Sequence, residues 1–165
     1  MRLCGIDPDM KGGMVAIDTE ASKVLDVGYM PLTWCRPPLN EPARVDPILL
    51  WTYLVGARRL GVDYVILERA LVMQQSGGKM MGGVDRTHQN FGAIRALCEL
   101  AFTPSRVIIA NPSVWKKAMG LTSDKQLSRD MACNLIPTHT NLFKLVKNTG
   151  LAEAALMALW GKSVV

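Results

Sequence analysis

Hydrophobic and polar positions show two kinds of periodicity along the chain, one typical of strands and one typical of helices. Near the N-terminus, short apolar runs bounded by Asp, Pro and Gly predict three strands that form an antiparallel meander. Later apolar runs alternate with segments in which apolar residues recur every three or four positions, the spacing of an amphipathic helix. The predicted strands cover residues 2–6, 14–18, 23–29, 63–68 and 106–110.

Capping residues and prolines indicate where the predicted helices begin and end. Asp46-Pro47 is a favourable N-cap and first-turn pair for a helix that reaches about Leu60. Residues 31–43 are Pro-rich and irregular, and Pro137 is a second break. A meander followed by alternating strands and helices predicts an α/β fold with a mixed five-stranded sheet flanked by helices. Further helices are predicted at residues 85–102, 113–119, 124–135 and 149–160.

Composition narrows the class of protein without identifying it. The chain has 165 residues, which is enough for a single domain over residues 1–165. No apolar run is long enough for a transmembrane helix, so we expect no membrane association. The N-terminus shows neither a signal peptide nor a transit segment. The four cysteines lack a CxxC pair, which favours reduced thiols inside a cell over a zinc site or a disulfide scaffold.

The net charge of +5 is compatible with nucleic acid as a partner. Many basic domains bind nothing anionic, so the net charge alone does not show that this chain binds nucleic acid.

Two acidic residues end predicted strands. Asp7 closes the first strand and Glu68 closes the fourth. If these strands are neighbours, both carboxylates emerge at the same edge of the sheet, where they repel unless a cation lies between them. Mg²⁺ favours such oxygen ligands, and a pair of metal ions can drive phosphodiester hydrolysis. Ordinary turn chemistry explains a strand-terminal acid equally well.

A third acid, Glu153, lies in the first turns of the last predicted helix, which is otherwise rich in Ala and Leu. Exposure to solvent, or an interaction with the helix dipole, would explain it without any function. With Glu153 included, the chain offers three candidate ligands for a metal ion.

Several segments resemble the RuvC-type Holliday junction resolvases of the RNase H-like superfamily. They are Gly5-Ile-Asp-Pro-Asp-Met-Lys-Gly-Gly13, Val65-Ile-Leu-Glu68, the stretch from Asn111-Pro-Ser-Val-Trp-Lys-Lys to Arg129, and Lys147-Asn-Thr-Gly-Leu-Ala-Glu-Ala-Ala-Leu156, which continues to Leu159-Trp-Gly-Lys162. The match covers nearly the whole chain, in order. It is most similar to the phage and plant-chloroplast branches of the family.

The resemblance implies an RNase H-like fold and a homodimer that cuts four-way DNA junctions symmetrically with Mg²⁺, or Mn²⁺ as a substitute. It implies that Asp7, Glu68 and Glu153 are the catalytic, metal-binding acids. It also implies an intracellular location, either a bacterial or phage-infected cytoplasm or, if a transit peptide has been removed, a chloroplast.

The chain departs from the family pattern just before Gly150, where an Asp or His is usual and this sequence has Asn148-Thr149. Thr149 and Glu153 are four residues apart and therefore face the same way on a helix. A threonine hydroxyl can hold a water molecule, so Thr149 is a candidate catalytic residue, but it is a poor base. Weakened catalysis, another metal preference and an inactive site all follow as possibilities.

Basic residues near the matching motifs are candidate DNA contacts, because phosphate contacts supply most of the affinity of such proteins. Lys125 and Lys147 lie within the motifs themselves. A solvated basic surface is the alternative for each residue. The candidates are Lys79, Arg86, Lys116, Lys117, Lys125, Arg129 and Lys147.

A Gly-rich segment from Gln74 to Gly83 closely follows Glu68 and contains Met80 and Met81. Apolar wedges of this kind can enter an opened base step and hold distorted DNA. We therefore expect Met80 and Met81 to contact the junction, with packing under the loop or in a dimer contact as the alternative.

Three functions compete on the sequence alone. The first is a two-metal endonuclease. The second is a junction-binding protein that has lost catalysis, which the pair Asn148-Thr149 favours. The third is an actin-like or sugar-kinase-like ATPase, which also begins with an acidic strand and a Gly turn. That third class needs a second, duplicated domain for which 165 residues leave no room.

Overall fold

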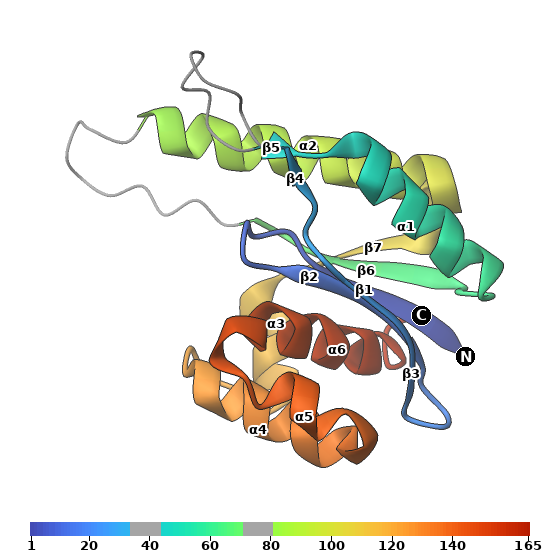
Figure 1. Ribbon diagram of the computed structural model, residues 1–165, viewed down its shortest axis with the longest axis vertical. Coiled ribbons are helices and arrows are strands. Elements are labelled where there is room, and N and C mark those ends of the chain that lie inside the picture. The colour runs from blue at the N-terminus through green and yellow to red at the C-terminus, as the bar shows by residue number, and fades with distance from the viewer. Residues whose placement is uncertain (34–43, 71–80) are drawn as a thin grey trace.

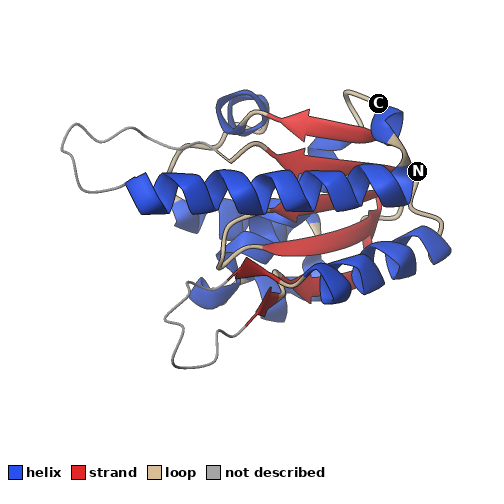
Figure 2. Ribbon diagram, turned by 90° about the horizontal axis from the view of Figure 1, so that it is seen from above, coloured by secondary structure: helices blue, strands red, loops and turns tan. Residues whose placement is uncertain are grey.

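The computed structural model describes residues 1–33, 44–70 and 81–165, with the backbone alone for residues 81–86. At its centre lies a mixed five-stranded sheet in the order β3-β2-β1-β6-β7 (Figures 1 and 2). The first three strands pair antiparallel, whereas β6 and β7 run parallel to β1. The strands are β1 (Arg2–Asp7), β2 (Gly13–Asp18), β3 (Lys23–Tyr29), β6 (Tyr64–Glu68) and β7 (Val107–Ala110).

Helices cover both faces of this sheet (Figure 1). Helices α1 (Pro47–Arg59) and α2 (Met81–Phe102) lie on one face. The other face carries α3 (Pro112–Ala118), α4 (Lys125–Leu135), α5 (Thr140–Phe143) and α6 (Thr149–Gly161). The remaining elements are the small sheet of β4 (Leu32–Thr33) and β5 (Arg44–Val45), and the 3-10 turns η1 (Pro104–Arg106), η2 (Pro137–His139) and η3 (Val146–Asn148).

Strand residues point alternately to the two faces, and this alternation builds two cores. On β1, Cys4 and Ile6 join the core beneath α1 and α2. Leu3, from the same strand, joins the core that contains most of α6. On β6, Val65 and Leu67 belong to the first core and Ile66 to the second. The period of two therefore directs Asp7 and Glu68, the last residues of these strands, toward the α6 face.

Glycine and alanine allow α6 to lie unusually close to the sheet. A Cβ atom added to Gly5 would overlap the carbonyl oxygen of Ala154, and one added to Gly13 would overlap the side chain of Leu151. Inside α6, residues Ala152, Ala154 and Ala155 are fully buried. This contact brings the first turns of α6 to the ends of β1 and β2, where Asp7 is located.

The five predicted strands and the five predicted helices are present, and the predicted α/β fold class is confirmed. Asp46 caps α1 as expected, because its carboxylate accepts hydrogen bonds from the amides of Ile48 and Leu49 at 2.9 and 3.1 Å. Helix α2 begins at Met81, earlier than the predicted residue 85. In the described part of the chain, no helix combines the length and apolarity needed to cross a membrane.

Candidate functional site

Asp7 and Glu68 lie at the ends of neighbouring parallel strands. Leu3 of β1 pairs with Tyr64 of β6, and the register continues to Ile6 and Leu67, one residue before each acid. The two strands are therefore neighbours, as the sequence analysis required, and both carboxylates emerge at the same end of the sheet. They also share one face, the α6 face, because each follows the alternation of its own strand.

Asp7 is a buried residue, 4% exposed, and its carboxylate accepts a hydrogen bond from the amide of Asp9 at 3.1 Å. No cationic side chain forms an ion pair with it within the described ranges 1–33, 44–70 and 81–165. Burial, followed by the charge of Asp9, raises the pKa of Asp7 to about 8, and the charges of Glu68 and Glu153 contribute to the increase. The Asp7 carboxyl therefore keeps its proton to a much higher pH than an ordinary aspartate does.

Glu68 is half-buried against α3. The indole Nε1–H of Trp115 donates a hydrogen bond to its Oε1 at 2.9 Å. Burial raises the pKa of Glu68, although the bond from Trp115 and the charge of Lys116 oppose the increase. Trp115 is itself fully buried, so it holds this carboxylate in a fixed position.

Glu153 reaches the same region from α6 and is 1% exposed. Its Oε1 accepts bonds from Lys116 Nζ at 2.8 Å and Ser128 Oγ at 3.1 Å, while its Oε2 accepts from Lys125 Nζ at 2.6 Å. Burial acts to raise the pKa of Glu153, but the hydrogen bonds and charges of the two lysines outweigh it and leave that pKa below its usual value. The expectation of mere solvent exposure is wrong for this residue.

The start of α6 brings these acids together. A Cβ atom on Gly150 would lie 2.9 Å from Oδ2 of Asp7 and 2.6 Å from the Cα atom of Gly12. Only glycine permits that approach of the helix to the loop after β1. The Coulombic influence of Glu68 and Glu153 on Asp7 reflects the same proximity.

Asn148 and Thr149, at the place where the resemblance led us to expect an Asp or His, are both engaged in hydrogen bonds. Asn148 accepts a bond from the hydroxyl of Tyr29 and donates one to the carbonyl of Leu142, both at 2.8 Å. The Thr149 hydroxyl donates to the carbonyl of Val146 and accepts from Nη1 of Arg129, both at 2.8 Å. The only proton of that hydroxyl is therefore already committed.

Asp7 and Glu68 have the chemistry expected of ligands to a hard divalent cation. Both are oxygen donors, and burial penalises their ionised forms, a cost that a bound cation relieves. Within the part of the chain that the structure describes, however, no three His, Cys, Asp or Glu side chains are gathered into a metal site. Glu153 differs from Asp7 and Glu68 because each of its two carboxylate oxygens accepts a hydrogen bond from a lysine.

The predicted DNA contacts fall into three groups. Lys117, Lys125 and Lys147 are exposed, Lys116 is partly buried, and Arg129 is buried at 6% exposure, so a solvated surface does not describe it. Met81 and Arg86 lie in α2, but their side chains are outside the described residues. Lys79 and Met80 are outside them altogether.

Three residues of the site escaped the sequence interpretation. Trp115 was not among the candidate site residues, yet its indole N–H donates to Glu68 and orients that carboxylate. Ser128 contacts Glu153, and Tyr29 reaches Asn148 across 119 positions of sequence. The one available signal was the position of Trp115 and Ser128 within the matching motifs.

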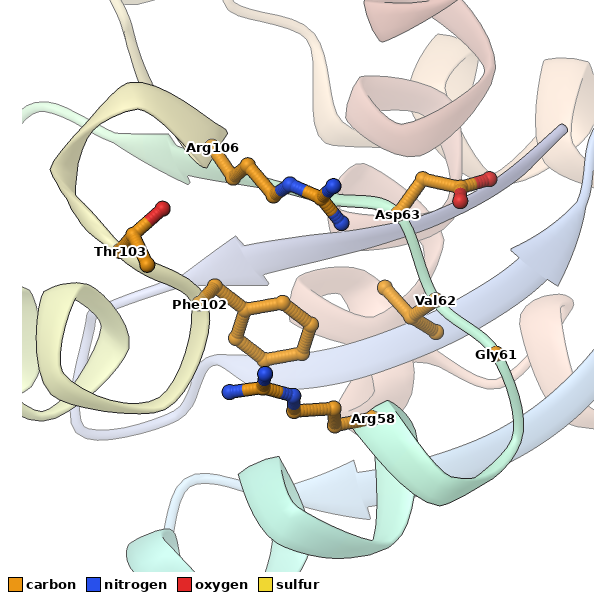
Figure 3. A pocket seen from close by; sticks show the side chains of 7 residues that line it. All are labelled: Arg58, Gly61, Val62, Asp63, Phe102, Thr103 and Arg106. Atoms are coloured by element: carbon orange, nitrogen blue, oxygen red, sulfur yellow. The ribbon is translucent and has the colours of Figure 1, made fainter.

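A separate pocket of about 500 Å³ lies at the opposite ends of the parallel strands (Figure 3). Arg58 and Arg106 reach toward it from different elements, and Phe102 and Val62 form its apolar wall. None of the predicted site residues lines this pocket.

Comparison with known proteins identifies the fold. No model of a known protein family matches the sequence, and no curated protein matches it either. Among solved structures, T. thermophilus RuvC in complex with a Holliday junction substrate matches with a TM-score of 0.65 and 18% identity, over 97% of this chain and 91% of that one. A second Thermus thermophilus RuvC structure matches with a TM-score of 0.62 and 20% identity, over 97% and 92%.

The chain has a RuvC-type fold. The RNase H-like architecture implied by the sequence motifs is thereby confirmed. At these identities the likeness to RuvC establishes the fold alone, so the phage or chloroplast branch stays a prediction. The RuvC-type fold places Asp7, Glu68 and Glu153 at one end of the sheet, on the face covered by α6.

Proposed function

We propose that this chain is a Holliday junction resolvase, a nuclease that nicks four-way DNA junctions at symmetric positions by metal-dependent phosphodiester hydrolysis. One observation carries the proposal: Asp7 and Glu68 end neighbouring strands on the face where Glu153 arrives, within a RuvC-type fold. The T. thermophilus RuvC structure that this chain resembles is described as a complex with a Holliday junction substrate.

In this proposal Asp7 and Glu68 hold the cation, Mg²⁺ or Mn²⁺, and Glu153 completes the set. When bound, the cation supplies an activated water and neutralises charge on the phosphate. Trp115 keeps Glu68 oriented, and the burial of Asp7 excludes bulk water from its carboxylate. Asp7 must be ionised to take part, and its raised pKa means that cation binding draws off its proton.

The proposed DNA surface surrounds this end of the sheet. Lys117 and Lys147 are exposed there and available for phosphates. Insertion of Met80 and Met81 into the junction, and phosphate contacts from Lys79 and Arg86, complete the proposal. Symmetric incision requires two active sites, so we also propose a homodimer.

A second candidate is a protein that binds junctions without cutting them. The committed hydroxyl of Thr149 favours it, because that group already donates to Val146 and accepts from Arg129. A neutral threonine hydroxyl is a poor general base, unlike the Asp or His that the resemblance led us to expect. This candidate retains junction recognition and differs only in the absence of nicks.

The test is incubation with a labelled synthetic four-way junction in Mg²⁺ and, separately, in Mn²⁺, with products resolved on a denaturing gel. We expect paired nicks near the crossover, lost in Asp7→Asn by at least roughly a hundredfold, as for removal of an essential electrostatic group. Asp63→Asn is the matched control, since Asp63 immediately precedes β6, at the end of that strand opposite Glu68, and its carboxylate accepts a bond from the amide of Arg2 at 3.1 Å.

Two other outcomes are informative. A shifted but uncut junction would support the binding-only candidate, and Thr149→His would then show whether the missing group restores cutting. Equal binding of the junction and a linear duplex, with no nicks, would exclude both candidates.

A further inference from the structure

The two oxygens of Glu153 are held in different ways. Oε1 accepts from both Lys116 and Ser128, at 2.8 and 3.1 Å. Oε2 has one side-chain partner among the described residues, Lys125, at 2.6 Å. Loss of Lys125 would therefore free one oxygen while the other keeps the carboxylate in place.

The partners also differ in burial. Ser128 is fully buried and the Lys116 side chain is 17% exposed, whereas the Lys125 side chain is 54% exposed. Lys116 is further restrained by the ring of Trp115, whose centroid lies 5.3 Å from its Nζ. Lys125 is the first residue of α4, so its backbone is fixed while its ammonium group can move between Glu153 and solvent.

Glu153 is buried, but the side chain of Lys125 is 54% exposed, so an anion that approaches from solvent can reach its ammonium group and compete with Glu153 for it. The phosphates of DNA form a dense line of negative charge that attracts lysine ammonium groups. Once Lys125 turns to a phosphate, Oε2 of Glu153 loses its ammonium partner, in the region that also holds the carboxyl groups of Asp7 and Glu68. The same region then attracts a divalent cation more strongly.

We propose that Lys125 is a displaceable cap on Glu153: it occupies Oε2 in the free protein, and junction binding removes it and completes the set of cation ligands. This inference rests on the proposed function and adds a mechanism of substrate control to it. Because binding couplings are reciprocal, the cation must also strengthen junction binding.

The first experiment measures Mn²⁺ binding by calorimetry, without DNA, for the wild type, Lys125→Met and Lys162→Met. The control is matched, since Lys162 also bonds to a glutamate Oε2, that of Glu20 at 2.9 Å, and is 48% exposed. We expect Lys125→Met to bind Mn²⁺ about tenfold more tightly than the wild type, within the usual range of coupling. Lys162→Met should match the wild type, and equal affinities in all three proteins would overturn the proposal.

The second experiment measures junction affinity by fluorescence anisotropy in EDTA and in Ca²⁺, with gels to verify that the DNA stays intact. Asp7→Asn reports the effect of Ca²⁺ on DNA alone. Beyond that background, Ca²⁺ should tighten junction binding by the wild type about tenfold, and by Lys125→Met much less. An equal Ca²⁺ effect in both proteins would contradict the cap.

The failures of the two proposals are distinguishable. If the wild type cuts junctions but Lys125→Met leaves Mn²⁺ affinity unchanged, only the cap is wrong. If no variant binds Mn²⁺ and no junction is cut, the metal-dependent function fails and the cap fails with it.

Discussion

At the scale of single residues, Asn148 is a buried amide whose two hydrogen bonds require an asparagine rather than an aspartate. Its amide accepts from Tyr29 and donates to Leu142, which joins β3 to the chain around α5. An aspartate could accept the first bond but could not donate the second. The side chain is 1% exposed, so the loss would not be repaired by solvent.

We therefore expect Asn148→Asp to destabilise the protein. The unpaired carbonyl of Leu142 and the buried charge together cost about 1–3 kcal/mol, which lowers the Tm by roughly 3–9 °C for a chain of this size. Thermal unfolding followed by circular dichroism measures the change. Asn141→Asp is the control, since Asn141 is exposed in the neighbouring α5. Equal Tm values for the two variants would show that the Leu142 contact is dispensable.

At the scale of elements, the site depends on how closely α6 lies on β1. Gly5 has no side chain that would keep the helix away from β1, and the buried alanines of α6 have only a small one. The carboxylates of Asp7 and Glu153 belong to these two elements. Any change that lifts α6 from the sheet also separates the acids.

Gly5→Ala tests this dependence. The added methyl group would overlap the backbone of Ala154, and overpacking of this kind costs about 1–3 kcal/mol or more. We expect a lower Tm together with weaker Mn²⁺ binding, both measured on the purified protein.

Gly92→Ala is the matched change on the other face of the sheet. Gly92 lies within α2, and apart from the adjoining backbone of that helix no atom of the described residues is within 4 Å of the added carbon, so alanine should stabilise the protein by about 0.5–1 kcal/mol. A Gly5→Ala variant as stable as Gly92→Ala would mean that α6 can move without cost.

At the scale of the whole molecule, buried acids make stability depend on pH. The pKa of Asp7 in the folded protein is about 8, against 3.8 for an ordinary aspartate. Its protonated form is thus favoured by folding. Its contribution to stability is complete below pH 3.8 and is lost as the pH rises through about 8. Glu68, whose pKa is also raised, acts in the same direction.

In EDTA, Asp7→Asn should therefore be more stable than the wild type at high pH. One pKa unit corresponds to about 1.4 kcal/mol, so we expect a Tm difference of at least roughly 3 °C at pH 8, which shrinks toward pH 4. Mn²⁺ should reverse the order by stabilising only the wild type. Scanning calorimetry between pH 4 and 9 measures both effects, and a difference that is independent of pH would contradict the assignment.

The sequence by itself determined the elements and the two strand-terminal acids. Apolar runs with a period of two produced the strands, and the N-cap Asp46 placed the start of α1, because both signals are local. The motifs also predicted a RuvC-type fold, which the solved structures confirm. The intracellular location and the homodimer are still predictions.

Only the tertiary structure decided the burial and the hydrogen-bond partners of the site residues. The burial of Glu153, its sharing between Lys116 and Lys125, and the bond from Tyr29 to Asn148 join segments far apart in the chain. No local pattern encodes such contacts, since they arise when α3, α4 and α6 pack on one face of the sheet. Burial and pairing set the charge of each acid, and both are properties of the packed molecule.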